Sequence, residues 1–468
     1  MLNLGDLFGT AEKVINRFSL KKEDFLDIRF FIGEGTTITI RNAASEQMSS
    51  EFDIGVGLRA LVNGAWGFST CKGFSQSELY KAMKAAIKVA KAVSGVEKNF
   101  VPEGYIFEGE EPLKIKVDPR EIALEEKVKV AVELEKNIAQ EGSQVKVSSA
   151  TISDMVQREV IINSLGTRVD VSNCYVRLSG GATVREGSLI QNVSESVGTS
   201  RGWETFMDLN PSEMGTKIGK RGIALLSALT PPGGNMKVVM DPSLVGVFIH
   251  EAFGHACEAD SVLSNMSVLS GKLEKKVGVP SINVIDDPTI PGLRGSYAYD
   301  SEGTKTNRRL IVDRGVFKGY LHSLETAAKM GVPPNGAGRA ADFNFKPIPR
   351  MSNTFIDGGD MSLEELCEEV KTGIFLAKSY GGYVNPAVGQ FFFTAQEGHL
   401  IENGKVGSLI QNVSMAGLTL EVLPNVIGVG KDLAMDFGGT CGKDSQWVPV
   451  IGGGPHIAVR DIIVGGYN

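Results

Sequence analysis

The order of helix-start signals and β-prone segments constrains the fold of this chain more than any other feature. Helix starts are marked by two capping boxes and by three acidic or amide residues that precede a proline. These signals lie at Ser75–Glu78, Ser362–Glu365, Asp118–Pro119, Asn210–Pro211 and Asp241–Pro242. Between them lie short β-prone segments broken by glycine, such as TTITIRN and REVIINSLGTRVDV. Because helices and strands do not alternate regularly, the sequence predicts an α+β fold with mixed or antiparallel sheets, flanking helices and a strand-rich C-terminal part.

Length and composition indicate a globular protein of more than one domain. At 468 residues the chain exceeds the ~250–300 residues at which a single hydrophobic core stops growing. Apolar residues make up 42 % and charged residues 22 % of the chain, which is typical of globular proteins. Glycine is in excess, with 56 residues, or roughly 12 % against the usual ~7 %. This excess indicates many turns and close approaches of the backbone.

Net charge and cysteine use argue against several classes of partner. The 48 basic and 55 acidic side chains give a net charge of −7, whereas binding to nucleic-acid backbones needs a clustered basic face. No apolar run approaches the ~18–20 residues of a membrane span, and the N-terminal segment lacks the basic region of a signal peptide. Five scattered cysteines fit a reducing compartment. We therefore expect a cytoplasmic protein without direct nucleic-acid or membrane partners.

The segment HEAFGH, residues 250–255, is the main candidate for a catalytic site. It is similar to the zincin pattern HExxH, in which two histidines four residues apart share one helical face and bind zinc. Here the histidines are five residues apart, which separates them by roughly 140° on a regular helix. A π-bulge, or unwinding at Gly254, would rotate His255 back toward His250. On an undistorted helix the two histidines would never meet.

Glu251, next to the first histidine, is the residue that a zinc hydrolase needs to deprotonate a metal-bound water. A catalytic zinc also needs a third protein ligand and an open position. Of the neighbouring candidates, Cys257 is expected to be a small buried hydrophobe, and His399 and His456 are expected to be structural histidines on strand edges. Spacing alone leaves the third ligand open among Glu258, Asp260, His399, His456 and Cys441.

Five sequence blocks together resemble the TldD/PmbA family, whose members are described as modulators of DNA gyrase and classed as metallopeptidases. The blocks are HEAFGHACEAD, GLRALVNGAWGFST, DSEGTKTNRRLIVDRGVFKGYL, GAGRA with PRMSNTFIDGGD, and FGGTCGKDSQWVPVIGGGP. The resemblance covers the chain from near residue 36 to its C-terminus. It implies that His250, His255 and Cys441 bind one Zn2+ per chain and that Glu251 is the catalytic acid/base.

The resemblance also implies a partner. The family contains a catalytic member with an intact HExxxH motif and a partner subunit without it, and this chain resembles the catalytic TldD type. We therefore expect a homodimer or a heterodimer with a family partner subunit. We predict an N-terminal α+β domain over residues 1–220 and a C-terminal metallopeptidase domain over residues 221–468. A repeated octapeptide, GSLIQNVS at 187–194 and 407–414, suggests a duplicated hairpin in the two halves.

The predicted activity is zinc-dependent hydrolysis of unfolded or short peptides, in which Glu251 activates the metal-bound water. The density of strands and glycines predicts that the substrate lies as an added β-strand between sheet edges. Arg339 and Arg350 are candidates for holding a substrate carboxylate or carbonyl, or else for structural ion pairs. Asp300 and Glu302 are candidates for accepting hydrogen bonds from the ligand histidines.

Two other functions remain open from the sequence. One is a non-enzymatic regulator or scaffold that binds gyrase or another protein around a structural metal, which would have no use for Glu251. The other is a cysteine nucleophile at Cys441, which would need a nearby histidine base. Such an enzyme would be inhibited by alkylation and not by chelators.

Overall fold

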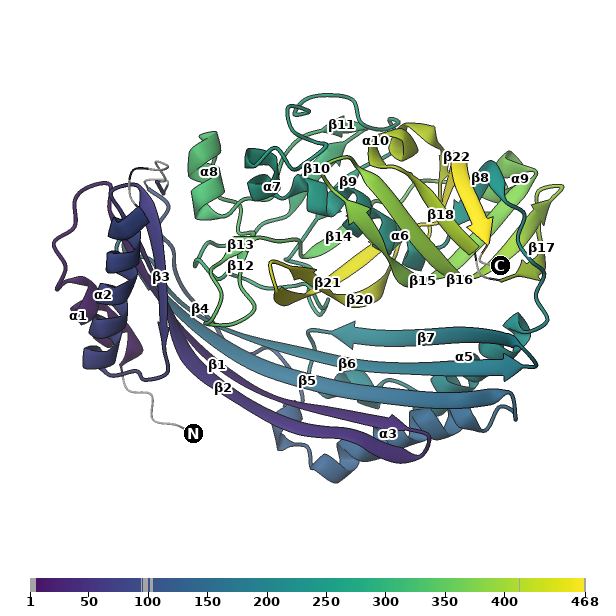
Figure 1. The fold of residues 1–468 in the computed structure, drawn as a ribbon, viewed down its shortest axis with the longest axis horizontal. Helices are drawn as coiled ribbons and strands as arrows, with labels where there is room; N and C mark the ends of the chain where they lie inside the picture. The colour runs from purple at the N-terminus through teal and green to yellow at the C-terminus, as the bar shows by residue number, and fades with distance from the viewer. Residues whose placement is uncertain (1–5, 94, 96–99, 102–103, 412, 467–468) are drawn as a thin grey trace.

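The computed structural model describes residues 6–93, 95, 100–101, 104–411 and 413–466 (Figure 1). A long, curved antiparallel sheet forms the N-terminal half of the molecule, and the C-terminal half lies over its concave side. Two helices cover the convex side of the sheet, and two more pack at one end (Figure 1). Within the described residues, no helix is both long and apolar enough to cross a membrane.

The curved sheet has the strand order β3-β2-β1-β5-β6, with these neighbours antiparallel; β7 pairs with β6 in the antiparallel direction and β4 in the parallel direction. Its strands are β1 (Phe25–Arg41), β2 (Ala44–Val62), β3 (Ala65–Cys71), β4 (Glu108–Glu111), β5 (Val145–Asn163), β6 (Arg168–Glu186) and β7 (Leu189–Thr199). The accompanying helices are α1 (Leu7–Ile15), α2 (Gln76–Val93), α3 (Leu124–Ala139), α4 (Glu204–Met207) and α5 (Pro211–Leu225). Alternate residues of β6, such as Val176 and Leu178, are buried with α3 and α5 in one cluster. The residues between them therefore face the C-terminal half.

The C-terminal half contains a closed ring of five strands and a second, open sheet. The ring is formed by β8 (Gly234–Met240), β15 (Gly373–Asn385), β16 (Gln390–Glu402), β18 (Val413–Leu418) and β22 (Ile457–Gly466), with β17 (Lys405–Ile410) and β19 (Val426–Val429) attached. The open sheet has the order β11-β10-β9-β14-β21-β20. Its strands are β9 (Val284–Asp286), β10 (Arg309–Asp313), β11 (Val316–Phe317), β14 (Asn353–Ile356), β20 (Ala434–Lys443) and β21 (Gln446–Gly454).

Helix α6 (Pro242–Phe248) is buried between the closed ring and the open sheet. The short strands β12 (Gly338–Arg339) and β13 (Ile348–Pro349) and the helices α7 (Ala259–Leu263), α8 (Leu324–Met330), α9 (Leu363–Val370) and α10 (Thr419–Val422) complete this half. All six α6 residues after Pro242 are buried, and the largest hydrophobic cluster surrounds the helix. The helix that leads into HEAFGH is therefore held firmly on both sides.

The predicted α+β fold, with its strand-rich C-terminal part, is confirmed. Four of the five predicted helix starts are also confirmed, because α2, α5, α6 and α9 begin directly after or next to their capping residues. The start at Asp118 is wrong in part: Asp118 caps a single 3-10 turn (Pro119–Glu121), and α3 begins later, at Leu124. The extended backbone of Ile122 and Ala123 separates the two. The division of the chain at residue 220 stays a prediction.

The two copies of GSLIQNVS do not form equivalent hairpins. The first copy runs from the β6–β7 turn into one continuous strand, whereas the second is divided between β17 and β18. The copies nevertheless meet, because the side chain of Gln191 donates a hydrogen bond to that of Gln411, its counterpart in the repeat. The repeat therefore lies at a contact between the N- and C-terminal halves.

A buried ion pair joins the same two halves, and a second lies within the curved sheet. Arg59 on β2 contacts Asp27 on the neighbouring strand, and its Nη1 lies 2.8 Å from a carboxylate oxygen of Glu302 in the C-terminal half. Arg29 on β1 pairs with Glu159 at 3.2 Å. Each of these arginines thus has a carboxylate partner, as buried charges require.

Candidate metal centre

The segment that carries HEAFGH begins as a well-capped helix. Asp241 accepts a hydrogen bond from the backbone N–H of Leu244 at 2.7 Å, and Pro242 occupies the first helical turn. Helix α6 ends at Phe248 and continues as a π-helical turn, Ile249–Gly254, followed by a 3-10 turn, His255–Cys257. The distortion that the five-residue histidine spacing requires is therefore present and confirms that prediction.

The π-helical turn brings His250 and His255 together. Their ring centroids are 5.3 Å apart, and the ring planes are nearly perpendicular, at 85°. Gly254 contributes by making room: a Cβ added there would lie 2.0 Å from Sδ of Met351. Its φ of −60° is ordinary for a helix, so close packing rather than a bend in the backbone explains the glycine.

Cys441 reaches the two histidines from strand β20, at the edge of the open sheet. Its Sγ lies 3.4 Å from Nε2 of His255, although the two residues are 186 positions apart in the chain. Together with His250 they form a group whose potential ligand atoms all lie within 4.8 Å of one another. It is the one group of three or more His, Cys, Asp or Glu side chains with this geometry in the described part of the chain.

The donor set and its geometry fit a tetrahedral zinc ion. Zinc binds Cys sulfur at ≈ 2.3 Å and His nitrogen at ≈ 2.0–2.1 Å, so two such atoms on one tetrahedral ion lie about 3.5 Å apart. The 3.4 Å separation of Cys441 Sγ and His255 Nε2 agrees with this value. Burial alone would raise the pKa of Cys441, but His250 and His255 lower it well below its usual range. A thiolate, the form that binds metals, is therefore favoured.

Glu258 is placed behind His255 rather than among the ligands. Its carboxylate lies 3.0 Å from Nδ1 of His255, on the opposite side of the ring from Cys441. Lys443 approaches the same carboxylate oxygen at 3.1 Å. Although burial opposes ionisation, Lys443, His255 and Arg350 lower the pKa of Glu258 to about 2. An ionised Glu258 fixes the tautomer in which Nε2 of His255 is free to bind a metal.

We predict that Glu258→Gln weakens zinc binding by about 10–100-fold, the usual effect of removing a hydrogen-bond partner of a metal-binding histidine. The measurement is competitive zinc titration of the folded protein against a chelator of known affinity. Asp260→Asn is the matched control, because Asp260 also pairs with Lys443, at 2.7 Å, and is expected to leave zinc affinity nearly unchanged. Wild-type affinity in Glu258→Gln would show that the carboxylate has no influence on the site.

The other sequence candidates for a third ligand lie elsewhere. Cys257 is buried in the hydrophobic core, which confirms its prediction as a small hydrophobe. Asp260 binds Lys443 with both carboxylate oxygens. His399 contacts the carbonyl of Gly407, and His456 contacts the carboxylate of Asp432. The geometry thus favours Cys441 from the set that spacing alone left open.

Arg339 and Arg350 are buried and bind backbone carbonyl groups of the chain itself. Nη1 of Arg339 donates to the carbonyl of Met351 at 2.6 Å. Nη2 of Arg350, which is fully buried, donates to the carbonyl of Cys441 at 2.6 Å. Arg350 therefore supports the backbone of the cysteine. The substrate role of both arginines stays a prediction that these contacts do not favour.

Asp300 and Glu302 do not contact the histidines. Asp300 accepts hydrogen bonds from the backbone N–H groups of Glu302, Thr304 and Gly338 at 2.8–3.0 Å, and burial together with Glu302 raises its pKa to about 8. Glu302 binds Arg59 and the backbone N–H of Leu324. The prediction that these two carboxylates orient the ligand histidines is wrong, because Glu258 occupies that place.

Glu251 lies on the accessible side of the group. Its Oε2 is 3.8 Å from Nε2 of His255, the nitrogen that faces Cys441. The side chain of Glu251 is 27 % exposed, against 13 % for His255, whereas His250 and Cys441 are buried. A carboxylate in this position can exchange protons with a water molecule or substrate that approaches the three ligands.

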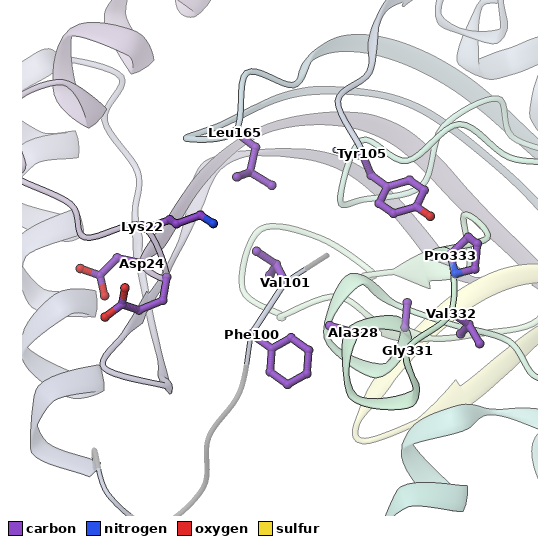
Figure 2. Close-up of a pocket in the computed structure, with 12 residues that line it drawn as sticks. Lys22, Asp24, Phe100, Val101, Tyr105, Leu165, Ala328, Gly331, Val332 and Pro333 are labelled. Atoms are coloured by element: carbon purple, nitrogen blue, oxygen red, sulfur yellow. The ribbon is translucent and has the colours of Figure 1, made fainter. Parts of the chain in front are cut away.

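A separate cavity of about 420 Å³ lies between the turn before β1 and helix α8 (Figure 2). Its lining includes Lys22, Asp24, Tyr105 and Leu165, together with Val332 after α8. None of the metal-binding candidates lines this cavity. It is therefore distinct from the metal centre.

Comparison with known proteins gives the context of this geometry. Three family models match the chain in order: PmbA/TldA metallopeptidase domain 1 over residues 26–91, the central domain over 117–226 and the C-terminal domain over 233–466. The chain belongs to the PmbA/TldD metallopeptidase family. It is therefore an enzyme of the metallopeptidase class, as the sequence resemblance predicted.

Relatives of this PmbA/TldD chain match it over nearly its whole length. Metalloprotease MJ0996 of Methanocaldococcus jannaschii is 40 % identical over 440 residues, which cover 93 % of this chain and 96 % of the relative. The zinc metalloprotease TldD homolog of Saccharolobus solfataricus is 30 % identical and covers 95 % of this chain and 97 % of its own. Both names describe the relatives and not this chain.

Solved structures share the fold. A putative modulator of DNA gyrase from Thermotoga maritima has a TM-score of 0.78 at 24 % identity, covering 98 % of each chain. TldE from Thermococcus kodakarensis has a TM-score of 0.79 at 18 % identity, covering 98 % of this chain and 99 % of its own. At such identities the likeness establishes the fold alone.

Proposed function

We propose that the protein is a zinc-dependent peptidase in which His250, His255 and Cys441 hold one Zn2+ and Glu251 is the acid/base. The observation that carries this proposal is the convergence of the three ligand atoms within 4.8 Å. The name of the zinc metalloprotease relative supports zinc as the metal. The fit of the 3.4 Å sulfur–nitrogen distance to tetrahedral geometry supports the same metal.

The chain itself contributes three metal ligands, a general base and the residues that hold the ligands in place. When bound, zinc supplies Lewis acidity that polarises a carbonyl and activates a water molecule. Glu251 accepts the proton of the attacking water and then delivers it to the nitrogen of the leaving amine. Glu258 keeps His255 oriented, and Arg350 holds the backbone carbonyl of Cys441.

We further propose that the substrate pairs as a strand with the open edge of β20. In the neighbouring strand, Pro449 has no N–H, and the N–H of Ile451 donates to the carbonyl of Ser352, away from β20. Thr440, which is exposed, lies opposite Pro449, so its backbone groups point to the free edge, whereas Gly438, opposite Ile451, is buried against β7. An extended peptide can satisfy such groups by β-augmentation close to Cys441.

Strand pairing at this edge requires an extended substrate. We expect the zinc-loaded enzyme to cleave an unfolded protein at least 10-fold faster than the same protein when folded, because folded chains do not present a free strand. The measurement compares a destabilised and a stabilised variant of one small substrate domain that share the cleaved segment. Equal rates on the two would contradict the proposed binding mode.

We propose that a second subunit covers an apolar row on the closed five-stranded sheet. Tyr383, Phe392, Ala416 and Ile463 lie opposite one another on consecutive strands, and Tyr383 and Ile463 are 68 % and 61 % exposed. We expect a homodimer or a heterodimer with a family partner subunit in light scattering, and Ile463→Lys is expected to weaken it. A monomer both alone and with the partner would contradict this.

The cytoplasmic location stays a prediction.

A further inference from the structure

Two arginines without a carboxylate partner lie at the junction between the curved sheet and the strand that carries Cys441. They are Arg177 on β6 and Arg294, which precedes β10 in the C-terminal half. Among the described residues, no ion pair involves either guanidinium group. Of the other buried arginines, Arg29, Arg59 and Arg309 each have a carboxylate within 3.2 Å, whereas Arg339 and Arg350 bind backbone carbonyl groups. This pair therefore differs from the structural ion pairs of the molecule.

The side chain of Arg294 connects the N- and C-terminal halves of the molecule. It is 8 % exposed, and its Nε donates to the carbonyl of Gly439 at 3.2 Å while Nη1 donates to the carbonyl of Val176 at 3.1 Å. Its side chain occupies the space beside Gly198 on β7, where a Cβ would lie 2.9 Å from Cδ. The remaining nitrogen, Nη2, has no hydrogen-bond partner within the described residues.

Arg177 lies on the same face of the curved sheet. It is directly opposite Gly198 in the β6–β7 ladder, so its side chain and Arg294 share the concave side. Its Nε is buried and has no hydrogen-bond partner among the described residues. The residue opposite on the other neighbouring strand is Ser153, and the next two on the same face of β6, Tyr175 and Ser179, are also uncharged in their ordinary state. Nothing beside Arg177 in this ladder neutralises it.

The absence of a counter-charge has an electrostatic cost. Burial and the nearby guanidinium of Arg177 lower the pKa of Arg294 to about 10, and burial lowers that of Arg177. Two like charges in a partly buried site repel each other strongly because water does not screen them fully. An anion between them removes the repulsion and supplies acceptors for the free guanidinium nitrogens.

The pair is close to the proposed metal centre. Arg294 holds the carbonyl of Gly439, which is two residues before Cys441 on β20, a distance of roughly 7 Å along a strand. β7 packs against β20 here, since a Cβ on Gly438 would lie 2.9 Å from the carbonyl oxygen of Gly198 (Figure 1). A peptide strand along the edge of β20 would place groups about two residues from its scissile bond near this pair.

From this arrangement we infer that Arg177 and Arg294 form a carboxylate-binding subsite, which selects peptides with a carboxylate about two residues from the scissile bond. The inference rests on the proposed peptidase function and adds its substrate preference. Two sources share this chemistry: the C-terminal carboxylate of a short peptide and an acidic side chain within a longer one. The first source makes the enzyme trim C-terminal dipeptides or similar pieces, and the second makes it an endopeptidase.

The test uses two matched peptide pairs and the zinc-loaded full-length protein. One pair differs only in a free or amidated C-terminus, and the other, amidated throughout, differs only in Glu or Gln at one position. We expect kcat/KM to favour the carboxylate member of at least one pair by about 10-fold or more, the effect of a charge-assisted hydrogen bond. The pair that shows the preference identifies the source.

Arg177→Gln is the test variant, because Arg177 makes no hydrogen bond or ion pair with the described residues that its removal would break. It is expected to reduce the preference below threefold, mainly by raising KM for the carboxylate peptide, and to leave cleavage of the neutral peptide unchanged. Arg177→Lys should recover part of the preference. Arg185→Gln, which removes the same charge from an exposed position of β6, is the matched control and should retain it fully.

Two outcomes would overturn the inference while the proposed function stands: neutral and carboxylate peptides cleaved equally well by the wild type, or a preference that survives in Arg177→Gln. If no peptide is cleaved, the proposed function fails, and equilibrium binding of the same peptide pairs to zinc-loaded wild type and Arg177→Gln still decides the inference. Tighter binding of the carboxylate peptide that depends on Arg177 supports it, and equal binding overturns it.

Discussion

Glu251→Gln is expected to reduce peptide cleavage by about 10²–10⁴-fold, the contribution that general acid–base catalysis usually makes. The amide keeps the shape of the side chain but cannot accept the proton of the attacking water. Glu251 is not one of the three grouped ligand residues, so zinc content is expected to remain that of the wild type. The measurement combines kcat on an unfolded substrate with metal analysis of the same preparation.

The control for this prediction is Glu364→Gln, which removes an equivalent carboxylate from an exposed position of α9. It should leave both kcat and zinc content unchanged. Persistent cleavage by Glu251→Gln with bound zinc would contradict the proposed mechanism. A wild-type protein that binds zinc but cleaves no peptide would favour the regulator or scaffold that the sequence left open.

Cys441→Ser is expected to weaken zinc binding by more than about 100-fold. Loss of a hydrogen-bond partner of a metal ligand already costs up to about 100-fold, and this variant loses the ligand itself. The serine hydroxyl is close in size to the thiol, but it stays protonated at neutral pH and offers no anionic donor. Cleavage should fall in parallel with zinc content. Competitive zinc titration and activity at several zinc concentrations measure the two effects together.

The same variant separates the peptidase from a cysteine nucleophile. In a metal site, chelators abolish wild-type activity, added zinc restores it, and excess zinc partly rescues Cys441→Ser. A nucleophilic Cys441 would instead leave activity insensitive to chelators, and no zinc concentration would rescue the serine variant. Ser261→Ala is a useful control for the substitution itself, since this residue belongs to α7 and is not part of the ligand group.

The local part of the site could be predicted from the sequence because spacing has direct geometric consequences. Two histidines five residues apart can face one another only on a distorted helix, and the π-helical turn provides that distortion. Cys441 was different, because 186 residues separate it from His255. Spacing could not select it among the candidates, so only the family resemblance pointed to it.

The supporting shell was the part that the sequence did not reveal. Glu258 was considered as a ligand, yet the 3-10 turn after Gly254 directs it to the far side of His255. Lys443 was missed, although its position two residues after Cys441 on a strand places both side chains on one face of the sheet. The isolated pair Arg177 and Arg294 depends on the packing of two distant segments, which no local pattern encodes.

The helix predicted from Asp118 shows that a local helix-start signal does not always predict where the helix begins. The Asp-Pro signal does begin a helical turn, but two extended residues, Ile122 and Ala123, interrupt it before α3. Ile122 packs against the hydrophobic cluster beneath the curved sheet. Tertiary packing therefore overrides the local start signal at this position.

Zinc K-edge X-ray absorption of the zinc-loaded protein tests the central claim most directly. We expect one zinc per chain, with one sulfur at ≈ 2.3 Å and two imidazole nitrogens at ≈ 2.0–2.1 Å, and loss of the sulfur contribution in Cys441→Ser. A zinc ion without a sulfur ligand in the active wild-type enzyme would contradict this expectation.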